Sequence, residues 1–106
     1  MPKYLVQGCY TADGLNGLLK EKASGRKAAV QSALKSVKAK MDALYFGVNG
    51  SDIVMVVDAP DNQSVASIMV TVMSTGAVDL MVTPLLTVGE MDSALTMSPK
   101  YRAPGE

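Results

Sequence analysis

The sequence contains neither histidine nor tryptophan, and it has a single cysteine. Without an imidazole the chain cannot form histidine-ligated zinc or haem sites, and it cannot use Ser-His or Cys-His catalysis. Cys9 cannot form a disulfide within the chain, and its position in an apolar segment predicts a buried small side chain rather than a reactive thiol. We therefore expect no metal and no cofactor.

An excess of charge of one sign is also missing, because ten basic residues balance ten acidic ones. This balance provides no electrostatic footprint for nucleic acid or for an anionic membrane surface. No apolar run approaches membrane-spanning length, and Met1-Pro2-Lys3 leads directly into strand-like sequence without a targeting signal. The sequence thus predicts a soluble cytoplasmic protein that has neither nucleic acid nor a membrane as a partner.

The chain has 106 residues, of which 48% are hydrophobic and 19% are charged. This length and composition predict one folded domain with a single core, which we place at residues 1–98, followed by a Pro- and Gly-containing tail at residues 99–106. Eight methionines indicate a core of irregular shape or, as the alternative, an adaptable binding surface.

Residues 45–60 are predicted to form two strands joined by a turn at the centre of the fold. Asn49-Gly50 is typical of a tight hairpin turn, because it supplies the positive φ that such a turn needs. The strand that follows, residues 52–58, is apolar on both faces and is closed by Pro60. A strand of this kind must be covered on both sides, which places it at the centre of a sheet.

Periodicity predicts the remaining elements. A short helical turn is expected at residues 15–22 and a long helix at 26–41, capped by Ser24. A capping box at Thr87 and Glu90 predicts a short final helix. Pro84 suggests that its strand lies at an edge or carries a bulge. The further predicted elements are strands at 3–10, 43–48 and 77–86, and a helix from 61 or 62 to Gly76.

This order, β-α-β-β-α-β with a C-terminal helix, predicts an α+β ferredoxin-like fold with a four-stranded antiparallel sheet. Helices would cover only one face of that sheet. The other face would carry apolar side chains, which are unfavourable to leave in water: Leu5, Cys9, Val54, Val56 and Met81. We therefore expect a homodimer, or a higher homo-oligomer, joined through this face.

The sequence also resembles the GYD domain family over residues 2–104. The resemblance lies in an ordered series of segments: Tyr10-Thr11, Gly17-Leu18-Leu19-Lys20, Ser24-Gly25-Arg26, Tyr45-Phe46-Gly47, Pro60-Asp61-Asn62 and Thr83-Pro84-Leu85-Leu86-Thr87. It implies the dimeric α/β-barrel arrangement and no established activity. The Gly-Tyr-Asp that names the family reads Gly50-Ser51-Asp52 here.

The candidate ligand-binding residues are expected around a cavity between the helix layer and the sheet: Gln7, Tyr10, Arg26, Tyr45 and Asp52. Tyrosines on strands can also be plain core residues. Asp52 can act as an acid or base at a cavity mouth, or as a turn carboxylate that accepts backbone N–H groups.

Three functions are compatible with this pattern. The first is a small-molecule-binding oligomeric module without assigned chemistry. The second is a cofactor-independent, oxygenase-like enzyme, and the third is a purely structural or regulatory oligomer. A ligand-sized pocket favours the first two, and a filled interface favours the third.

Overall fold

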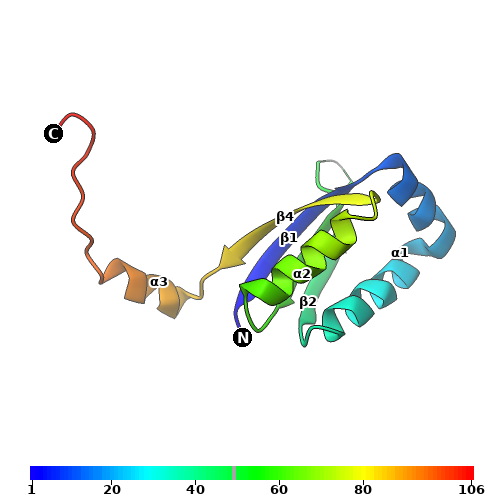
Figure 1. The fold of residues 1–106 in the computed structure, drawn as a ribbon, viewed down its shortest axis with the longest axis horizontal. Helices are drawn as coiled ribbons and strands as arrows, with labels where there is room; N and C mark the ends of the chain where they lie inside the picture. Colours follow the sequence, from blue (N-terminus) through cyan, green and yellow to red (C-terminus); the bar gives the residue numbers. More distant parts are fainter. Residues whose placement is uncertain (49) are drawn as a thin grey trace.

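A computed structural model describes residues 1–48 and 50–106 of the chain. Its four strands form one antiparallel sheet in the order β2-β3-β1-β4 (Figure 1). The α+β ferredoxin-like prediction is confirmed, with a third helix at the C-terminal end. The elements are β1 (Lys3–Tyr10), α1 (Ala12–Lys35), β2 (Lys40–Phe46), β3 (Ile53–Asp58), α2 (Asn62–Met73), β4 (Val78–Leu85) and α3 (Val88–Leu95).

The core lies between the sheet and the helices α1 and α2. Alternate residues of the two central strands face it, because side chains along a strand point to opposite sides of the sheet. These residues are Tyr4 and Val6 on β1, and Ile53, Met55 and Val57 on β3, all at most 5% exposed.

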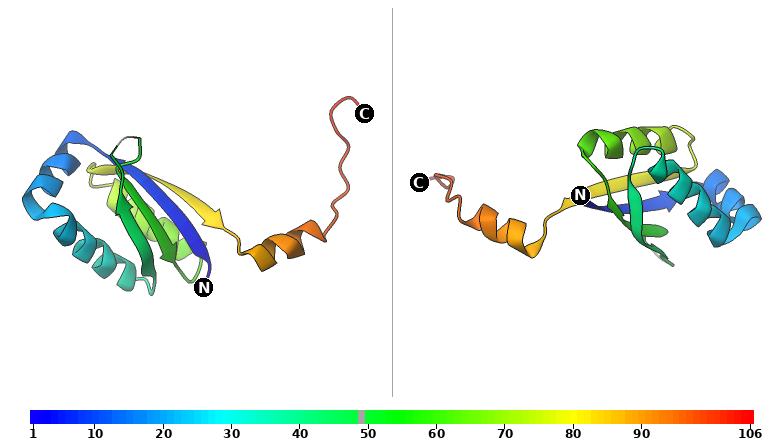
Figure 2. Two further views of the ribbon diagram at one scale, coloured as in Figure 1. Left: turned by 180° about the vertical axis from the view of Figure 1, so that it is seen from behind. Right: turned by 90° about the horizontal axis from the view of Figure 1, so that it is seen from below.

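The intervening residues form the opposite side of the sheet, which we call the open face. The left view of Figure 2 shows the open face toward the viewer, with α2 on the far side of the strands. The open face contains the five residues predicted for it, and the register aligns several of them across strands: Leu5 pairs with Val56, and Gln7 lies between Val54 and Met81. Cys9 contradicts the prediction of a buried thiol. It is exposed on this face near the end of β1, and its Sγ lies 3.0 Å from the Gly50 carbonyl oxygen.

Helix α1 differs most from the prediction. It begins at Ala12 because the Thr11 hydroxyl accepts the Gly14 N–H, and it ends at Lys35 rather than continuing to residue 41. The predicted interruption at Ser24-Gly25 and the Ser24 cap are wrong. The break lies at Lys22, which has φ +65°, and residues 24 and 25 are helical.

The predicted turn at Asn49-Gly50 falls partly on Asn49, which lies outside the described residues. Gly50 has φ +94°, the left-handed conformation that favours glycine. The strand after the turn is β3, which begins one residue later than predicted. Its partner β2 carries a register irregularity between Met41 and Ala43. Met41 belongs to this strand and not to the preceding helix.

The ends of the later elements follow local capping chemistry. Asp61 caps α2 by accepting the Ser64 N–H at 2.8 Å. The predicted capping box of Thr87 and Glu90 is present at the start of α3. β4 is an edge strand, as Pro84 suggested. Within the described part of the chain, no helix has the length and apolar character needed to cross a membrane.

Candidate functional site

A cavity of about 370 Å³ opens between α1 and α2, and the sheet forms its floor. This size falls within the range of about 300–1,000 Å³ typical of ligand pockets. Most of its lining is apolar, since both helices turn their hydrophobic stripes toward it. The principal apolar contributors are Val30 and Leu34 from α1, Val37 from the turn after it, Val65, Ile68 and Met69 from α2, and Val6, Met55 and Leu80 from the sheet.

The residues that line the cavity include Tyr10 and Arg26. Arg26 Nη1 donates to Glu21 Oε1 at 2.9 Å, forming an ion pair. This bond uses one of the five N–H donors of the guanidinium. The cavity wall therefore carries a permanent cation whose position is fixed by a neighbouring carboxylate.

Burial raises the pKa of Tyr10 above its usual 10.0, because the phenolate would lose hydration. The Arg26 cation opposes this shift, while the carboxylates of Glu21 and Asp52 add to it. Three charged side chains thus act on the Tyr10 phenol. At neutral pH the Tyr10 hydroxyl is protonated and can donate a hydrogen bond.

The break in α1 brings Arg26 to Glu21. Five residues apart on a continuous helix, the two side chains would lie on different faces. The positive-φ, non-helical backbone at Lys22 separates the two halves of α1 and redirects the second half. The ion pair consequently bridges the break.

Tyr10 is positioned by the junction between β1 and α1. The Thr11 N–H donates to the Ala77 carbonyl oxygen at 2.9 Å, and the Thr11 hydroxyl donates to the Gly76 carbonyl oxygen at 2.8 Å. These bonds fasten the end of β1 to the connection between α2 and β4. Ala77 and Val78 line the cavity beside Tyr10.

The structure brings together some of the predicted site residues and separates others. Tyr10 and Arg26 share the cavity, and Asp52 lies behind Tyr10, where its Oδ2 accepts the Tyr10 backbone N–H at 2.8 Å. Gln7 and Tyr45 lie on the open face, where both neighbour Val54. Strand alternation explains the separation, because Gln7 and Tyr10 point to opposite sides of β1.

Glu21 was missed by the sequence analysis, although it holds Arg26 in place. The sequence does not indicate this contact, because two residues five positions apart do not meet on an unbroken helix. Most apolar wall residues belong to the predicted helical stripes and strands, so the periodicity did locate them. Among residues 1–48 and 50–106, no group of three or more Cys, Asp or Glu side chains could hold a metal ion.

The element order, the antiparallel sheet and the cavity beneath two helices define a ferredoxin-like α+β domain. A family model described as the GYD domain matches residues 4–95, and the chain belongs to that family. The match includes all the residues that line the cavity and ends at the last residue of α3. Searches of curated proteins and of solved structures gave no match.

Proposed function

We propose that the protein is a small-molecule-binding module whose ligand occupies the cavity between α1 and α2. The observation that carries this proposal is a ligand-sized, mostly apolar space whose lining includes Arg26 and the protonated Tyr10. Apolar walls supply affinity through burial of the ligand, and the few polar groups fix its orientation.

The lining also defines the chemistry of the ligand. A long apolar body matches the side chains of Val30, Ile68 and Leu80. A single acidic group matches Arg26, whose remaining N–H donors suit a carboxylate, and the Tyr10 hydroxyl can add a second donor. The ligand class is therefore an amphipathic molecule with an aliphatic or aromatic body and one anionic end.

Octanoate and 1-octanol are suitable probes, because they share an alkyl chain and differ in the charged group. We expect octanoate to bind more tightly than 1-octanol in calorimetry. Arg26→Gln should weaken octanoate binding by about tenfold or more, since a hydrogen bond to a charged group contributes about 1.5–3 kcal/mol. Binding of 1-octanol should change little.

Lys27→Gln is the matched control. It removes the same charge from the neighbouring, exposed position of α1, and octanoate should bind it as it binds the unmodified protein. Methyl NMR spectra should show octanoate shifts at Val30 and Ile68. Shifts confined to Val54 and Val56 would place the probe on the open face and contradict the proposal.

The functional unit that we infer is a homodimer joined through the open face. Leu5, Val54 and Val56 are only partly covered there, and Met81 is 68% exposed. Apolar side chains gathered on one side of a sheet support contact with another protein surface. A second copy offers the same apolar face, and a two-fold axis can pair the two faces.

A further inference from the structure

The residues after β4, 86–106, form a projecting segment that we call the arm. It includes α3 and is longer than the tail of residues 99–106 predicted from the sequence. The arm leaves the end of β4 and does not return over the sheet or over α1 and α2 (Figures 1 and 2). Both the helix and the residues that follow it are therefore open to solvent.

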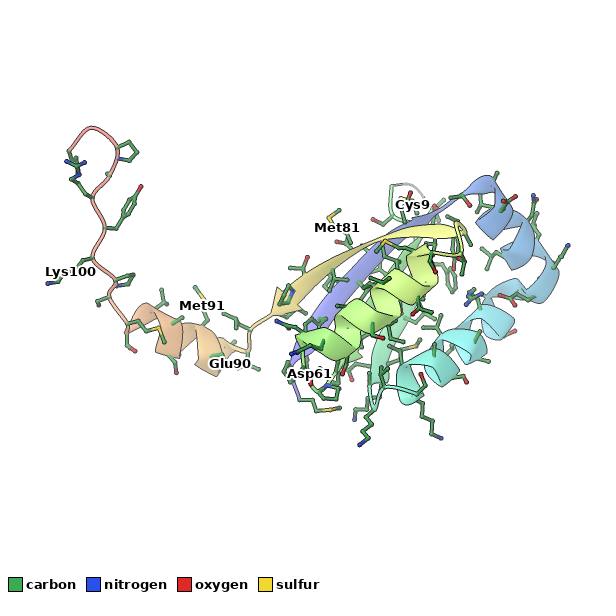
Figure 3. The ribbon with its side chains drawn as sticks, viewed as in Figure 1. Cys9, Asp61, Met81, Glu90, Met91 and Lys100 are labelled. Carbon is green, nitrogen blue, oxygen red and sulfur yellow. The ribbon has the colours of Figure 1, made fainter. Side chains whose placement is uncertain are left out.

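Helix α3 has an apolar stripe without a covering surface. Val88, Met91 and Leu95 are 83%, 47% and 67% exposed, and their spacing places them on one side of the helix. Leu86, Met97 and Tyr101 continue the exposed apolar character along the arm. In Figure 3, the labelled side chains of Met91 on α3 and Met81 on β4 both rise above the ribbon. The stripe adds to the exposed apolar surface of the chain.

A helix of eight residues is too short to be stable alone in water, where about 12–15 residues are marginal. The capping box of Thr87 and Glu90 satisfies backbone groups at its start, but capping contributes only about 1 kcal/mol. Most helical stability comes from packing of an apolar face. The stripe of α3 needs a surface that its own subunit does not supply.

The exposed area supports the same conclusion quantitatively. The chain exposes 7414 Å², whereas a compact chain of its mass exposes about 5,700 Å². The excess of about 1,700 Å² is larger than the roughly 800 Å² that each partner buries in a standard interface. The radius of gyration, 16.9 Å, likewise exceeds the value of about 13 Å expected for a compact domain of this length.

We propose that the arm packs its stripe of Val88, Met91 and Leu95 on a second copy of this chain, which packs its own arm in return. Each copy carries one projecting arm and one open face, so a two-fold pair covers both features with the same contacts repeated. The proposal rests on the inferred homodimer, which it deepens, and is independent of ligand binding in the cavity.

The test compares Leu95→Glu with Ser93→Glu, which add the same charge to the same helix. Leu95 lies in the stripe, and Ser93 lies on the opposite side of α3. In sedimentation velocity, Leu95→Glu and a chain ending at Leu86 should both raise the dimer dissociation constant at least about tenfold. Ser93→Glu should leave it within about twofold.

A second measurement uses dimers formed from ¹³C-labelled and unlabelled copies. Contacts from the methyl groups of Met91 and Leu95 to the other copy are expected. Contacts of the arm with its own subunit alone would overturn the arm proposal. The same conclusion would follow if Leu95→Glu and the truncation left the dimer unchanged; neither result would contradict the homodimer itself. A monomer at every concentration would overturn the homodimer as well, whereas octanoate binding would still report separately on the cavity.

Discussion

The backbone N–H of Tyr10 donates a 2.8 Å hydrogen bond to Oδ2 of Asp52. In the same region the Asp52 N–H donates to the Gly8 carbonyl oxygen at 2.7 Å. Asp52 therefore joins the entry to β3 to the end of β1, where Tyr10 reaches the cavity. The aspartate of the Gly50-Ser51-Asp52 segment contributes to the position of the tyrosine through its carboxylate, which accepts the Tyr10 backbone N–H.

Replacement of Asp52 tests this role. Asp52→Asn keeps an oxygen that can accept the Tyr10 N–H, so we expect little change in unfolding free energy and unchanged octanoate affinity. Asp52→Ala removes the acceptor and should lower the unfolding free energy by about 1.5–3 kcal/mol. Urea denaturation measures both variants. A loss of octanoate affinity in Asp52→Asn equal to that in Arg26→Gln would assign the carboxylate to the ligand instead.

Two glycines of α1 should respond oppositely to the same substitution. A Cβ at Gly14 would overlap the Ala77 carbonyl oxygen and approach Tyr10 Cδ1 to 2.9 Å, whereas a Cβ at Gly17 meets no atom within 4 Å. Gly14→Ala should destabilise the protein by about 1–3 kcal/mol. Gly17→Ala should stabilise it by about 0.5–1 kcal/mol, because alanine favours the helix. Equal effects in urea denaturation would contradict the tight junction of α1 with Ala77.

The break in α1 predicts a second contrast. Lys22 has φ +65°, a conformation that costs a non-glycine residue about 1–3 kcal/mol. Lys22→Gly should relieve this cost and leave the protein as stable or more stable. Lys20→Gly, at an exposed helical position, should lower the unfolding free energy by about 1 kcal/mol. Thermal unfolding of the two variants distinguishes them, and a loss of stability in both would argue for a regular helix through residue 22.

The ion pair between Lys3 and Asp58 predicts the acid dependence of stability. Lys3 Nζ donates to Asp58 Oδ1 at 2.7 Å and to Asp42 Oδ2 at 3.0 Å. The hydrogen bond from Lys3 lowers the pKa of Asp58 below its usual 3.8. The ionised Asp58 carboxylate therefore stabilises the fold fully at a pH above 3.8. This stabilisation is lost as the pH falls through the folded pKa of Asp58.

The pKa of Lys3 is raised above its usual 10.5, mainly by its hydrogen bond to Asp58. The contribution of the Lys3 cation to folding stability is present below pH 10.5. It is lost only as the pH rises through the folded pKa of Lys3. Asp58→Asn should therefore be less stable than the unmodified protein at about pH 7, and the difference should shrink as the pH falls below 3.8. Asp79→Asn, at an exposed position on β4, serves as the control. A difference that is constant over this range would contradict the pairing.

The homodimer that we propose to form through the open face predicts a position-dependent effect of lysine. Val56→Lys places a charge at the centre of this face and should convert the dimer to single chains in light scattering. Val70→Lys makes the same change on α2, where Val70 is 67% exposed, and should leave the mass unchanged. Circular dichroism verifies that both variants are folded. A dimer that persists in Val56→Lys would exclude this interface.

Much of the fold could be predicted because its signals are local. The alternation along β1 and β3, the Asp61 cap and the Thr87–Glu90 capping box each follow from neighbouring residues. The break at Lys22 could not be predicted in this way. Lysine is a good helix former, and Gly25, the residue expected to interrupt the helix, fits within it.

The candidate site could be predicted only for residues whose place in the fold follows from their own secondary-structure element. Tyr10 and Arg26 were placed at the cavity because one ends a strand and the other enters a helix above the sheet. The ion pair of Arg26 with Glu21 depends on the path of α1, which the spacing of residues does not encode. The opposite directions of Gln7 and Tyr10, in contrast, follow from alternation along β1 alone.

The outer strands limit how this sheet can grow. The pairing of β2 shifts register between Met41 and Ala43, and β4 contains Pro84, which has no N–H to offer a further strand. Exposed strand edges otherwise act as templates for fibre formation. We therefore expect concentrated solutions to contain closed assemblies of fixed size rather than filaments extended strand by strand.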